Sequence, residues 1–332
     1  MKRLLFLGCI LVALTKPNTI LATDNPLSRP NNYFGIHIIN EHDIDAAAEM
    51  VNGSGGQWGY VTFVIREDER DIGRWSLVFE KLKQQKLIPI VRIATKSKNG
   101  IWLKPDINDA QEWANFLNKL PWPTQNRYVV LFNEPNHAKE WGGQINPDNY
   151  AKVARRFWEK FKRASVDFFI LPAALDTAAK NSPQTKDAVD FWQEMYVSDN
   201  LIFTIFDGYN SHSYPNPGFC GNPTDSGRNS IRSFEWETSY LERYYLQSKT
   251  QIFITETGWG CNIAGTQISE FYKYAFENIW TDKRLVAVTP FLLNYTQTPF
   301  QKFSWIDTAG NKKPYYELVK NIQKIKGEPA IL

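Results

Sequence analysis

Short apolar runs alternate with longer amphipathic stretches along the chain from residue 33 onward. The short runs are rich in Val, Ile, Phe and Tyr, which is typical of buried strands, and the longer stretches carry apolar residues at helical spacing. The predicted strands cover residues 33–39, 58–66, 87–94, 127–132, 166–173, 207–212, 251–256 and 286–293. The predicted helices cover residues 44–50, 72–85, 107–120, 147–164, 185–196, 230–247, 267–280 and 314–325. Pro147 and Pro314 begin the fourth and eighth helices, a first-turn position that proline favours.

This alternation predicts an α/β protein whose eight strand–helix units form one (β/α)₈ barrel, the TIM-barrel architecture. Strands that are apolar throughout belong in a parallel sheet that is covered on both faces. An open doubly wound sheet is the alternative, and it fits less well because no glycine-rich phosphate-binding loop follows the first strand. No linker rich in Pro, Ser or Gly interrupts the chain, so residues 23–332 are expected to form a single domain.

Residues 1–22 have the pattern of a secretory signal peptide. Two basic residues precede an apolar run over residues 4–14, and the small residue Ala22 follows. The run is shorter than the about 20 residues that cross a bilayer, so a membrane anchor is the weaker interpretation. Cys9 loosely matches a lipoprotein cleavage site, but the apolar run before it is too short for that role. We therefore expect export to the periplasm, cell surface or medium without stable membrane insertion.

The charge distribution supports this interpretation. The formal net charge is +3, and the leader alone contributes three bases and no acid, so the remainder is balanced. A neutral body argues against a nucleic-acid-binding protein, which is expected to present a basic patch. The composition, 43% hydrophobic and 22% charged, is that of a globular chain. The 12 Trp residues suit either a sugar-binding cleft or a Trp-rich core.

Two cysteines remain after the leader, Cys220 and Cys261. In an exported protein a pair of cysteines favours a disulfide over a metal site, and the chain has no Cys-x-x-Cys or His-x-x-x-His pattern for zinc. In the barrel they follow the adjacent sixth and seventh strands, so their loops are expected to be neighbours and to carry a disulfide.

Two glutamates stand at the ends of predicted strands. Glu134 lies in the segment Phe-Asn-Glu-Pro-Asn after the fourth strand, and Glu256 ends the seventh. The C-terminal ends of barrel strands form the active site, so both carboxylates are expected to meet in one cleft. Such a pair can act as an acid and a nucleophile, because their surroundings separate their pKa values. A surface salt bridge is the ordinary alternative for either residue.

Alternation along the strands predicts what lies beneath each glutamate. If Glu134 faces the barrel axis, Phe132 and Val130 do so too. The same parity directs Ile252 and Ile254 inward below Glu256, which would give both carboxylates an apolar floor.

Three polar residues share one face of the sixth strand, Asn210, His212 and Tyr214. A tyrosine hydroxyl can keep a neighbouring carboxylate ionised, and a histidine can hold an acid or contact a sugar hydroxyl. Arg66 and Arg92, near the ends of the second and third strands, are candidates to stabilise the ionised glutamate. A structural ion pair is the alternative for these arginines, as a core position is for His212.

These motifs resemble clan A of the glycoside hydrolases, retaining (β/α)₈ enzymes that include cellulase-like and β-mannanase-like families. The matching segments are Asn133-Glu134-Pro135, His212-x-Tyr214 and Glu256, with a similar final loop and helix around Trp305 to Tyr316. The resemblance implies that Glu134 is the acid/base and Glu256 the nucleophile. It also implies that Asn133 contacts the sugar 2-hydroxyl and that Tyr214 partners the nucleophile.

One position departs from that pattern. Clan members commonly place a Trp at the end of the eighth strand, where this chain reads Phe-Leu-Leu-Asn-Tyr over residues 291–295. Tyr295 or Trp305 is the candidate replacement as a sugar platform. The remaining candidate substrate contacts are Trp141 and Trp259, in loops after catalytic-face strands, and His37 in the first strand.

The sequence thus predicts a glycosidase that cleaves β-linked poly- or oligosaccharides by double displacement with net retention, as a monomer without metal or organic cofactor. Two alternatives stay open, a catalytically silent glycan-binding barrel and a transglycosylase with the same residues. The first does not need both glutamates together with Tyr214. The second differs only in excluding water from the second step.

Overall fold

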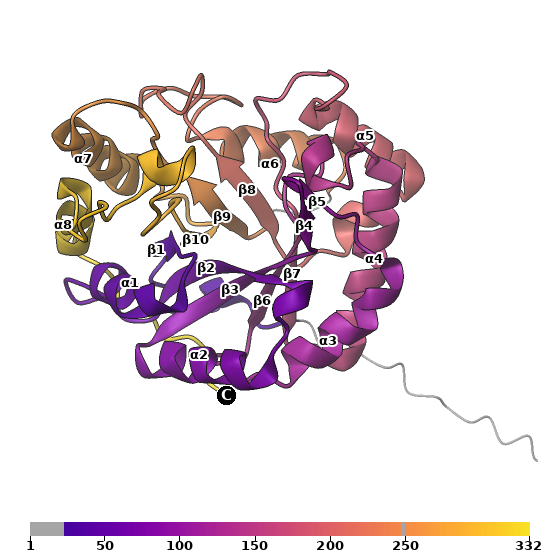
Figure 1. Ribbon diagram of the computed structural model, residues 1–332, viewed down its shortest axis with the longest axis horizontal. Coiled ribbons are helices and arrows are strands. Elements are labelled where there is room, and N and C mark those ends of the chain that lie inside the picture. Colours follow the sequence, from indigo (N-terminus) through magenta and orange to yellow (C-terminus); the bar gives the residue numbers. More distant parts are fainter. Residues whose placement is uncertain (1–22, 247–249) are drawn as a thin grey trace, which may run out of the picture.

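A ring of eight parallel strands surrounded by helices makes up the computed structural model, which describes residues 23–246 and 250–332 (Figure 1). The barrel strands are β1 (Gly35–His37), β2 (Gly59–Arg66), β3 (Leu87–Ala94), β6 (Arg127–Leu131), β7 (Phe168–Pro172), β8 (Tyr209–Ser213), β9 (Ile252–Thr257) and β10 (Leu285–Val288). The helices are α1 (Ile44–Val51), α2 (Ile72–Gln84), α3 (Ala110–Asn118), α4 (Pro147–Ala164), α5 (Ala188–Ser198), α6 (Ser233–Tyr244), α7 (Gly265–Tyr274) and α8 (Pro314–Asn321). A short hairpin, β4 (Ser97–Lys98) and β5 (Ile101–Trp102), follows β3.

Each predicted strand–helix unit is present, with ends that differ by a few residues. The predicted helix over 107–120 begins with a 3₁₀ turn, Ile107–Asp109, and the one over 267–280 ends as a π-helical turn, Ala275–Ile279. Proline occupies the first turn of α4 and α8, as predicted, and the side chain of Asn146 caps α4 by accepting from the Asn149 amide at 2.8 Å. Residue 247 of the predicted sixth helix lies outside the described residues.

The strands run in sequential order in two ladders. One ladder has the order β1-β2-β3-β6-β7, and the other has the order β10-β9-β8. A parallel bridge between Phe34 and Val288 joins β1 to β10. At the other seam Asp207 donates its amide to the Ile170 carbonyl at 3.0 Å and accepts the Ile170 amide on its carboxylate at 2.7 Å. Sequential order around a ring confirms the (β/α)₈ barrel and excludes the open doubly wound sheet, in which the order reverses.

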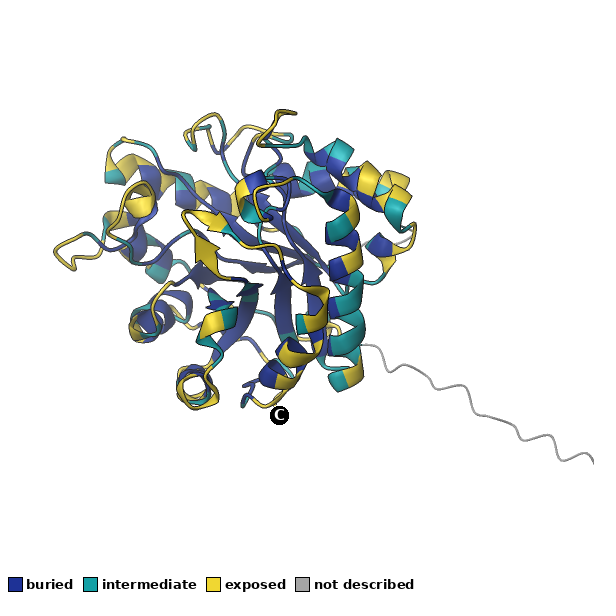
Figure 2. Cartoon of the chain, turned by 45° about the vertical axis from the view of Figure 1, so that its right-hand side comes forward, coloured by how far each residue is buried: buried dark blue, intermediate teal, exposed yellow. Residues whose placement is uncertain are grey.

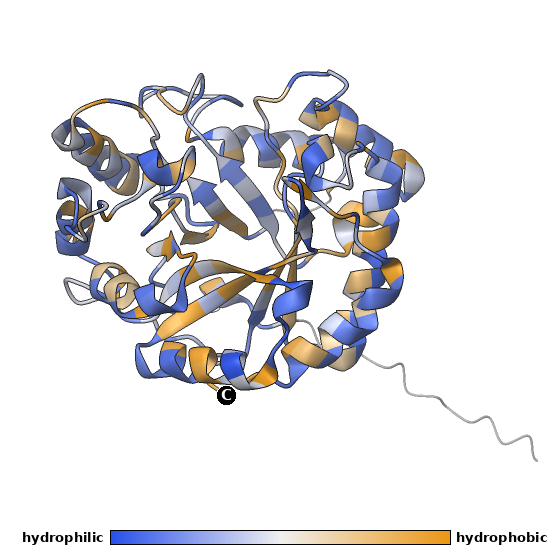
Figure 3. Cartoon of the chain, in the orientation of Figure 1, coloured by the Kyte–Doolittle hydropathy of each residue, from blue (hydrophilic) through white to orange (hydrophobic). Residues whose placement is uncertain are grey.

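The core has two layers. Side chains inside the ring form a small apolar cluster made of Tyr60, Ile88, Ile90, Tyr128, Val130, Phe169, Leu171, Phe253, Val286 and Ala287. The larger cluster lies between the strands and the helices, whose outer faces are exposed (Figure 2). The strands are coloured mostly as apolar in Figure 3, with the clear exception of β8, which is polar and yet fully buried. The inner cluster fills the barrel, so any chemistry must take place at its rim.

The polar strand β8 is explained by a buried acid on α6. Glu237 accepts hydrogen bonds from Tyr209 at 2.6 Å, from Ser211 at 2.6 Å and from Ser233 at 2.8 Å. These bonds satisfy the outward face of β8 and leave its inward face for the site. Burial raises the pKa of the Glu237 carboxyl.

Within the described residues, no helix is both long and apolar enough to cross a membrane. The predicted signal peptide, residues 1–22 with Cys9, lies outside the described residues.

Candidate active site

Two glutamates and one histidine meet at the C-terminal rim of the barrel. Glu134 follows β6, His212 is the fourth residue of β8 and Glu256 lies near the end of β9. One side-chain atom from each lies within 4.8 Å of the others. His212 Nδ1 is 2.8 Å from Glu134 Oε1 and 3.7 Å from Glu256 Oε2. Both carboxylates therefore lie together at the rim of the barrel, as the sequence predicts.

Glu256 is held by two further donors. Tyr214 donates its hydroxyl to Glu256 Oε2 at 3.0 Å, and Arg92 donates from its guanidinium to Glu256 Oε1 at 2.5 Å. Arg92 also donates to Asn133 Oδ1 at 2.6 Å. Bonds of this kind from ionised or polar donors favour the carboxylate form. Tyr214 and Arg92 therefore lie beside Glu256, the predicted nucleophile, as the sequence predicts.

Burial and neighbouring charges shift the pKa values of Glu256, His212 and Tyr214 in different directions. Burial by itself raises the pKa of the Glu256 carboxyl, but the positive charges of His212 and Arg92 outweigh burial and hold that pKa at about 2. For His212, burial lowers the pKa, while the negative charges of Glu256 and Glu134 outweigh it and leave the pKa raised. Burial, together with Glu256 and Glu134, raises the pKa of Tyr214 well above 10, so its hydroxyl keeps the proton that it donates. Glu256 is therefore ionised at neutral pH.

His37 lies behind Glu256 and is fully buried. Its Nδ1 is 4.0 Å from Glu256 Oε1, and burial lowers its pKa to about 3. The side chain is therefore neutral near pH 7. Neither of its ring nitrogens has a hydrogen-bond partner among the described residues, and with no exposed surface the side chain does not fit the predicted contact with sugar.

Glu134 does not reach the site by simple strand alternation. Val130 faces the barrel interior as predicted, but Phe132 points outward and packs against Trp141 and Phe157. Phe132 and Glu134 have φ of +72° and +26°, in the left-handed region, so the chain turns over immediately after β6. The prediction that Phe132 lies beneath Glu134 is wrong because this turn shifts the parity.

A register shift in β9 likewise changes which side of the strand Glu256 faces. Ser211 pairs with Ile254 and His212 pairs with Glu256, so β9 carries an extra residue at this point. Phe253 faces inward, whereas Ile252 and Ile254 pack in the outer core. The predicted floor of Ile252 and Ile254 is therefore wrong, and the bulge is what directs Glu256 into the cleft. On β8, which has no extra residue, Asn210, His212 and Tyr214 share the inward face as predicted, with Asn210 accepting from Thr255 at 2.6 Å.

The tryptophans predicted as sugar-binding walls lie in the interior. Trp141 and Trp259 are 1% exposed, and Trp305 is 0% exposed. Rings this deeply packed present no face to a sugar, so these residues contribute to the core. A sequence cannot distinguish a loop tryptophan that lines a cleft from one that closes the core beneath it.

Arg66 is also placed away from the site. Its guanidinium pairs with Asp68 at 3.1 Å and Glu69 at 3.3 Å, and its side chain is 41% exposed. In the pairing of β2 with β3, Val64 lies opposite Arg92, so Arg66 lies two residues farther along its strand. Arg92 alone supplies the positive charge predicted for these two arginines. Tyr295 is half-buried, with its ring centroid 6.4 Å from that of Phe300.

Several residues near the site were missed by the sequence analysis. Trp102, at the end of the β4–β5 hairpin, is half-buried and lines a small cavity with Arg92 and Asn133. Phe291 is half-buried and meets His37 edge to face, with centroids 5.2 Å apart. Phe291 begins the segment 291–295, in which the sequence predicts an aromatic sugar platform, so its position in the sequence could have identified it. Trp102 had no such signal.

A further pair lies beside Glu134. His137 Nε2 is 2.9 Å from Asp176 Oδ2, and the two residues come from the loops after β6 and β7. Burial lowers the pKa of His137, but Asp176 and Glu134 outweigh it and leave the pKa raised. This pair extends the polar rim of the barrel beyond Glu134.

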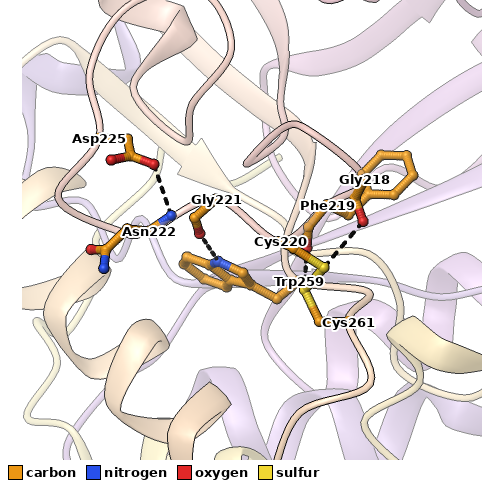
Figure 4. The surroundings of a disulfide bond; sticks show 8 residues. All are labelled: Gly218, Phe219, Cys220, Gly221, Asn222, Asp225, Trp259 and Cys261. Carbon is orange, nitrogen blue, oxygen red and sulfur yellow. Dashed lines mark hydrogen bonds between the residues drawn. A yellow bond between two sulfur atoms is a disulfide. The ribbon is translucent and has the colours of Figure 1, made fainter.

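The predicted disulfide joins Cys220 and Cys261 in the loops after β8 and β9 (Figure 4). Their Cα atoms are 5.4 Å apart. Trp259 donates its indole N–H to the Gly221 carbonyl at 2.8 Å and so reinforces the same connection. The two loops that carry Tyr214 and follow Glu256 are therefore held together.

Glu134, His212 and Glu256 offer donor atoms at a spacing that a metal ion also accepts. The Arg92 guanidinium already occupies Glu256 Oε1, and a cation bound there would be repelled by it. Arg92 thus compensates the charge of Glu256 within this donor set.

Comparisons with known proteins establish the fold. No protein-family model matches the chain, and neither does any curated protein. Among solved structures, an endo-β-1,3-glucanase of family GH128, subgroup II, from Sorangium cellulosum has 14% identity over 87% of this chain and 97% of its own, with a TM-score of 0.55. An endo-β-1,4-glucanase from Xanthomonas axonopodis pv. citri has 16% identity over 87% and 97%, with a TM-score of 0.56.

A third similar structure is a glycoside hydrolase family 5 lichenase from Caldicellulosiruptor sp. F32, a point mutant in complex with cellotetraose. It has 13% identity over 86% of this chain and 83% of its own, with a TM-score of 0.54. At these identities the likeness bears on architecture. The chain therefore has the (β/α)₈ fold that these glycoside hydrolases share.

Proposed function

We propose that the protein is a retaining glycoside hydrolase that cleaves β-linked glycans. The observation that carries the proposal is that a carboxylate oxygen of Glu134 and one of Glu256 lie within 4.8 Å of each other at the barrel rim. Retaining enzymes hold their two carboxyl groups about 5 to 5.5 Å apart, whereas inverting enzymes need about 6.5 to 9.5 Å to admit a water molecule. The short spacing favours direct attack by one carboxylate.

Glu256 is the proposed nucleophile because it is buried, ionised and held by hydrogen bonds from Arg92 and Tyr214. Its carboxylate attacks the anomeric carbon while the bond from that carbon to the leaving oxygen breaks. Glu134 donates its proton to that oxygen. In the second step Glu134, now a base, takes a proton from water, which attacks the anomeric carbon and releases Glu256.

The neighbours of the glutamates have defined tasks in this scheme. Arg92 and Tyr214 keep Glu256 ionised and fix its orientation, since each bonds to a different carboxylate oxygen. His212 bonds to Glu134 and lies between the two acids. Asn133, held by Arg92, is the proposed contact for the sugar 2-hydroxyl.

The proposed substrates are neutral β-glucans or related β-glycans. The solved structures with this fold include enzymes named for β-1,3-glucan, β-1,4-glucan and lichenan. Apart from the first 22 residues the chain has no net formal charge, which agrees with an uncharged substrate. We further propose that residues 1–22 direct export, that residues 23–332 form the catalytic domain and that it acts as a monomer.

The test is a screen of purified protein against β-1,3-, β-1,4- and mixed-linkage glucans, mannan, xylan and aryl β-glycosides. Glu256→Ala and Glu134→Ala should abolish or strongly reduce activity, while Glu112→Gln, on an exposed ion pair, should not. NMR of the first anomer released should show retention. An inverted product would exclude double displacement, and turnover of none of these substrates would favour a silent glycan-binding barrel. Products longer than the substrate would identify a transglycosylase.

A further inference from the structure

A third carboxylate lies next to the proposed catalytic pair. Glu140 ends the 3₁₀ turn Ala138–Glu140 that follows Glu134, and its side chain is only 8% exposed. Glu140 Oε2 accepts a hydrogen bond from Asn133 Nδ2 at 3.1 Å. The two steps of the proposed reaction make no direct use of this carboxylate.

The carboxylate completes a chain of contacts that reaches the nucleophile. Asn133 turns its amide nitrogen toward Glu140 and its amide oxygen toward Arg92, which donates to it at 2.6 Å. The same guanidinium nitrogen of Arg92 donates to Glu256 Oε1 at 2.5 Å. The Glu140 carboxylate accepts hydrogen bonds and the Arg92 guanidinium donates them, so the Asn133 amide has only one favourable orientation. If the amide were flipped, its oxygen would face the carboxylate and its N–H groups would face the guanidinium.

Within the described part of the chain, Asn133 is the side chain that donates a hydrogen bond to Glu140, and Lys139 is the cation that forms an ion pair with it. Its nearest cation is Lys139, with Nζ 3.8 Å from Oε1, and the lysine side chain is 57% exposed. Burial of the carboxyl group, followed by the negative charge of Glu134, raises its pKa. Burying the Glu140 carboxyl group near a second acid, Glu134, costs free energy. We therefore expect the contact between Glu140 and Asn133 to have a function that offsets this cost.

The cavity beside Glu140 is too small for a sugar ring. The cavity that Glu140 lines together with Trp102 and Thr95 has a volume of about 30 Å³. That volume holds one or two water molecules and not a pyranose ring. Glu140 is therefore placed to act through Asn133.

We propose that Glu140 is a positioning residue: its carboxylate holds one N–H of Asn133, so that the amide oxygen stays on Arg92 and the second N–H is left for the sugar 2-hydroxyl. The inference rests on the proposed function, because the 2-hydroxyl contact belongs to that reaction. Hydrogen bonds to this hydroxyl strengthen in the glycosidase transition state, so a misplaced amide is expected to slow the chemical step.

The test compares Glu140→Ala, Glu140→Gln, Asn133→Ala and the double alanine variant on an aryl β-glycoside and on its 2-deoxy analogue. Glu140→Ala should lower kcat/KM about 10- to 100-fold on the 2-hydroxy substrate and less than about threefold on the 2-deoxy substrate. Glu140→Gln, which keeps a carbonyl acceptor, should recover most of the activity. The double variant should be no slower than Asn133→Ala alone.

Equal losses on the two substrates would overturn the proposal, since that pattern indicates a general structural role. A further loss in the Asn133→Ala background would also overturn it. The free energies of unfolding of the same four proteins provide a readout without substrate, in which coupling between the two positions is expected and additivity contradicts it. If the wild type turns over no glycoside, the proposed function fails, whereas the unfolding cycle still decides whether Glu140 holds Asn133.

Discussion

The two ladders of the barrel contribute to the site in different ways. In the five-stranded ladder each strand pairs with the next without a register shift, and Arg92 projects from a regular strand. In the three-stranded ladder both pairings carry a shift, at Ser211/His212 and at Leu285/Ala287. The regular ladder supplies Arg92 and, just beyond its fourth strand, Asn133 and Glu134. The irregular ladder supplies His212 and Glu256.

This difference shows how a barrel can be both stable and reactive. A parallel ladder in register buries its strands efficiently, but alternation then fixes which side chains reach the interior. A bulge releases one side chain from that alternation. Glu256, the proposed nucleophile, lies at such a bulge, and Glu134, the proposed acid/base, lies where the chain turns after β6.

The largest expected effect comes from replacing Glu256 or Glu134, and it distinguishes the chemical roles of these two residues, which belong to different ladders. Glu256→Ala should lower kcat by on the order of 10⁴-fold on every substrate, because no nucleophile remains. Glu134→Ala should cost as much on a polysaccharide but far less on a dinitrophenyl glycoside, whose leaving group needs no proton for the first step. Single-turnover kinetics on both substrates checks this. Equal losses on the activated substrate would contradict the assigned roles.

The link from Arg92 to Glu256 crosses between the ladders and controls the acid limb of activity. The proposed reaction needs ionised Glu256, so activity falls as the pH drops through its pKa, which Arg92 helps to hold low. Arg92→Met should raise that pKa and move the acid limb of kcat/KM upward by about 1 to 3 pH units, with activity reduced at all pH values. Arg66→Met, an exposed arginine outside the site, is the control and should leave the profile unchanged. An unmoved acid limb in Arg92→Met would exclude this electrostatic role.

The disulfide holds the loops of the irregular ladder together. Cys220 and Cys261 are separated by 41 residues, and removing the bond in Cys220→Ser/Cys261→Ser should lower the free energy of unfolding by about 2 to 4 kcal/mol. Denaturant unfolding under non-reducing conditions measures the loss. Unchanged stability would show that Trp259 and the surrounding packing suffice to hold these loops.

The smallest expected effect concerns the seam between the ladders. Asp207 joins β7 to β8 through the Ile170 amide and accepts from Lys162 at 2.7 Å, with both charged side chains 15% exposed. Asp207→Asn should destabilise the fold by about 1 to 3 kcal/mol, because Lys162 loses its charged partner. The matched change Asp148→Asn, in an exposed ion pair with Lys152, should cost less than about 0.5 kcal/mol. Equal costs in thermal or urea unfolding would mean that the seam does not depend on this contact.

Local patterns were sufficient for a large part of this molecule. Eight strand–helix units, the order in which they follow one another and the position of Glu134 and Glu256 at strand ends are all readable from residue types and spacing. His212 and Tyr214 share a face with Asn210 because β8 has no extra residue and strand alternation therefore holds. The cysteine pair followed from the adjacency of successive barrel strands.

The errors concern features that depend on distant contacts. Phe132 and Ile254 were assigned to the wrong side because a turn and a bulge alter the count, and neither leaves a mark in the residue types. The sequence does not show whether a loop tryptophan lines a binding site or belongs to the core, since its burial depends on what packs above it. This applies to Trp141, Trp259 and Trp305.

The βα alternation, the barrel architecture and the two carboxylates at strand ends follow from the residue pattern, because periodicity and spacing are local properties of the chain. The folded barrel is needed to show that Arg92 and not Arg66 reaches Glu256, that Glu140 contacts Asn133 and that His37 is buried near Glu256. These contacts join residues far apart in the chain, or turn on the direction in which the backbone leaves a strand. Their formation therefore depends on the ring of strands, which brings the ends of all eight to one rim.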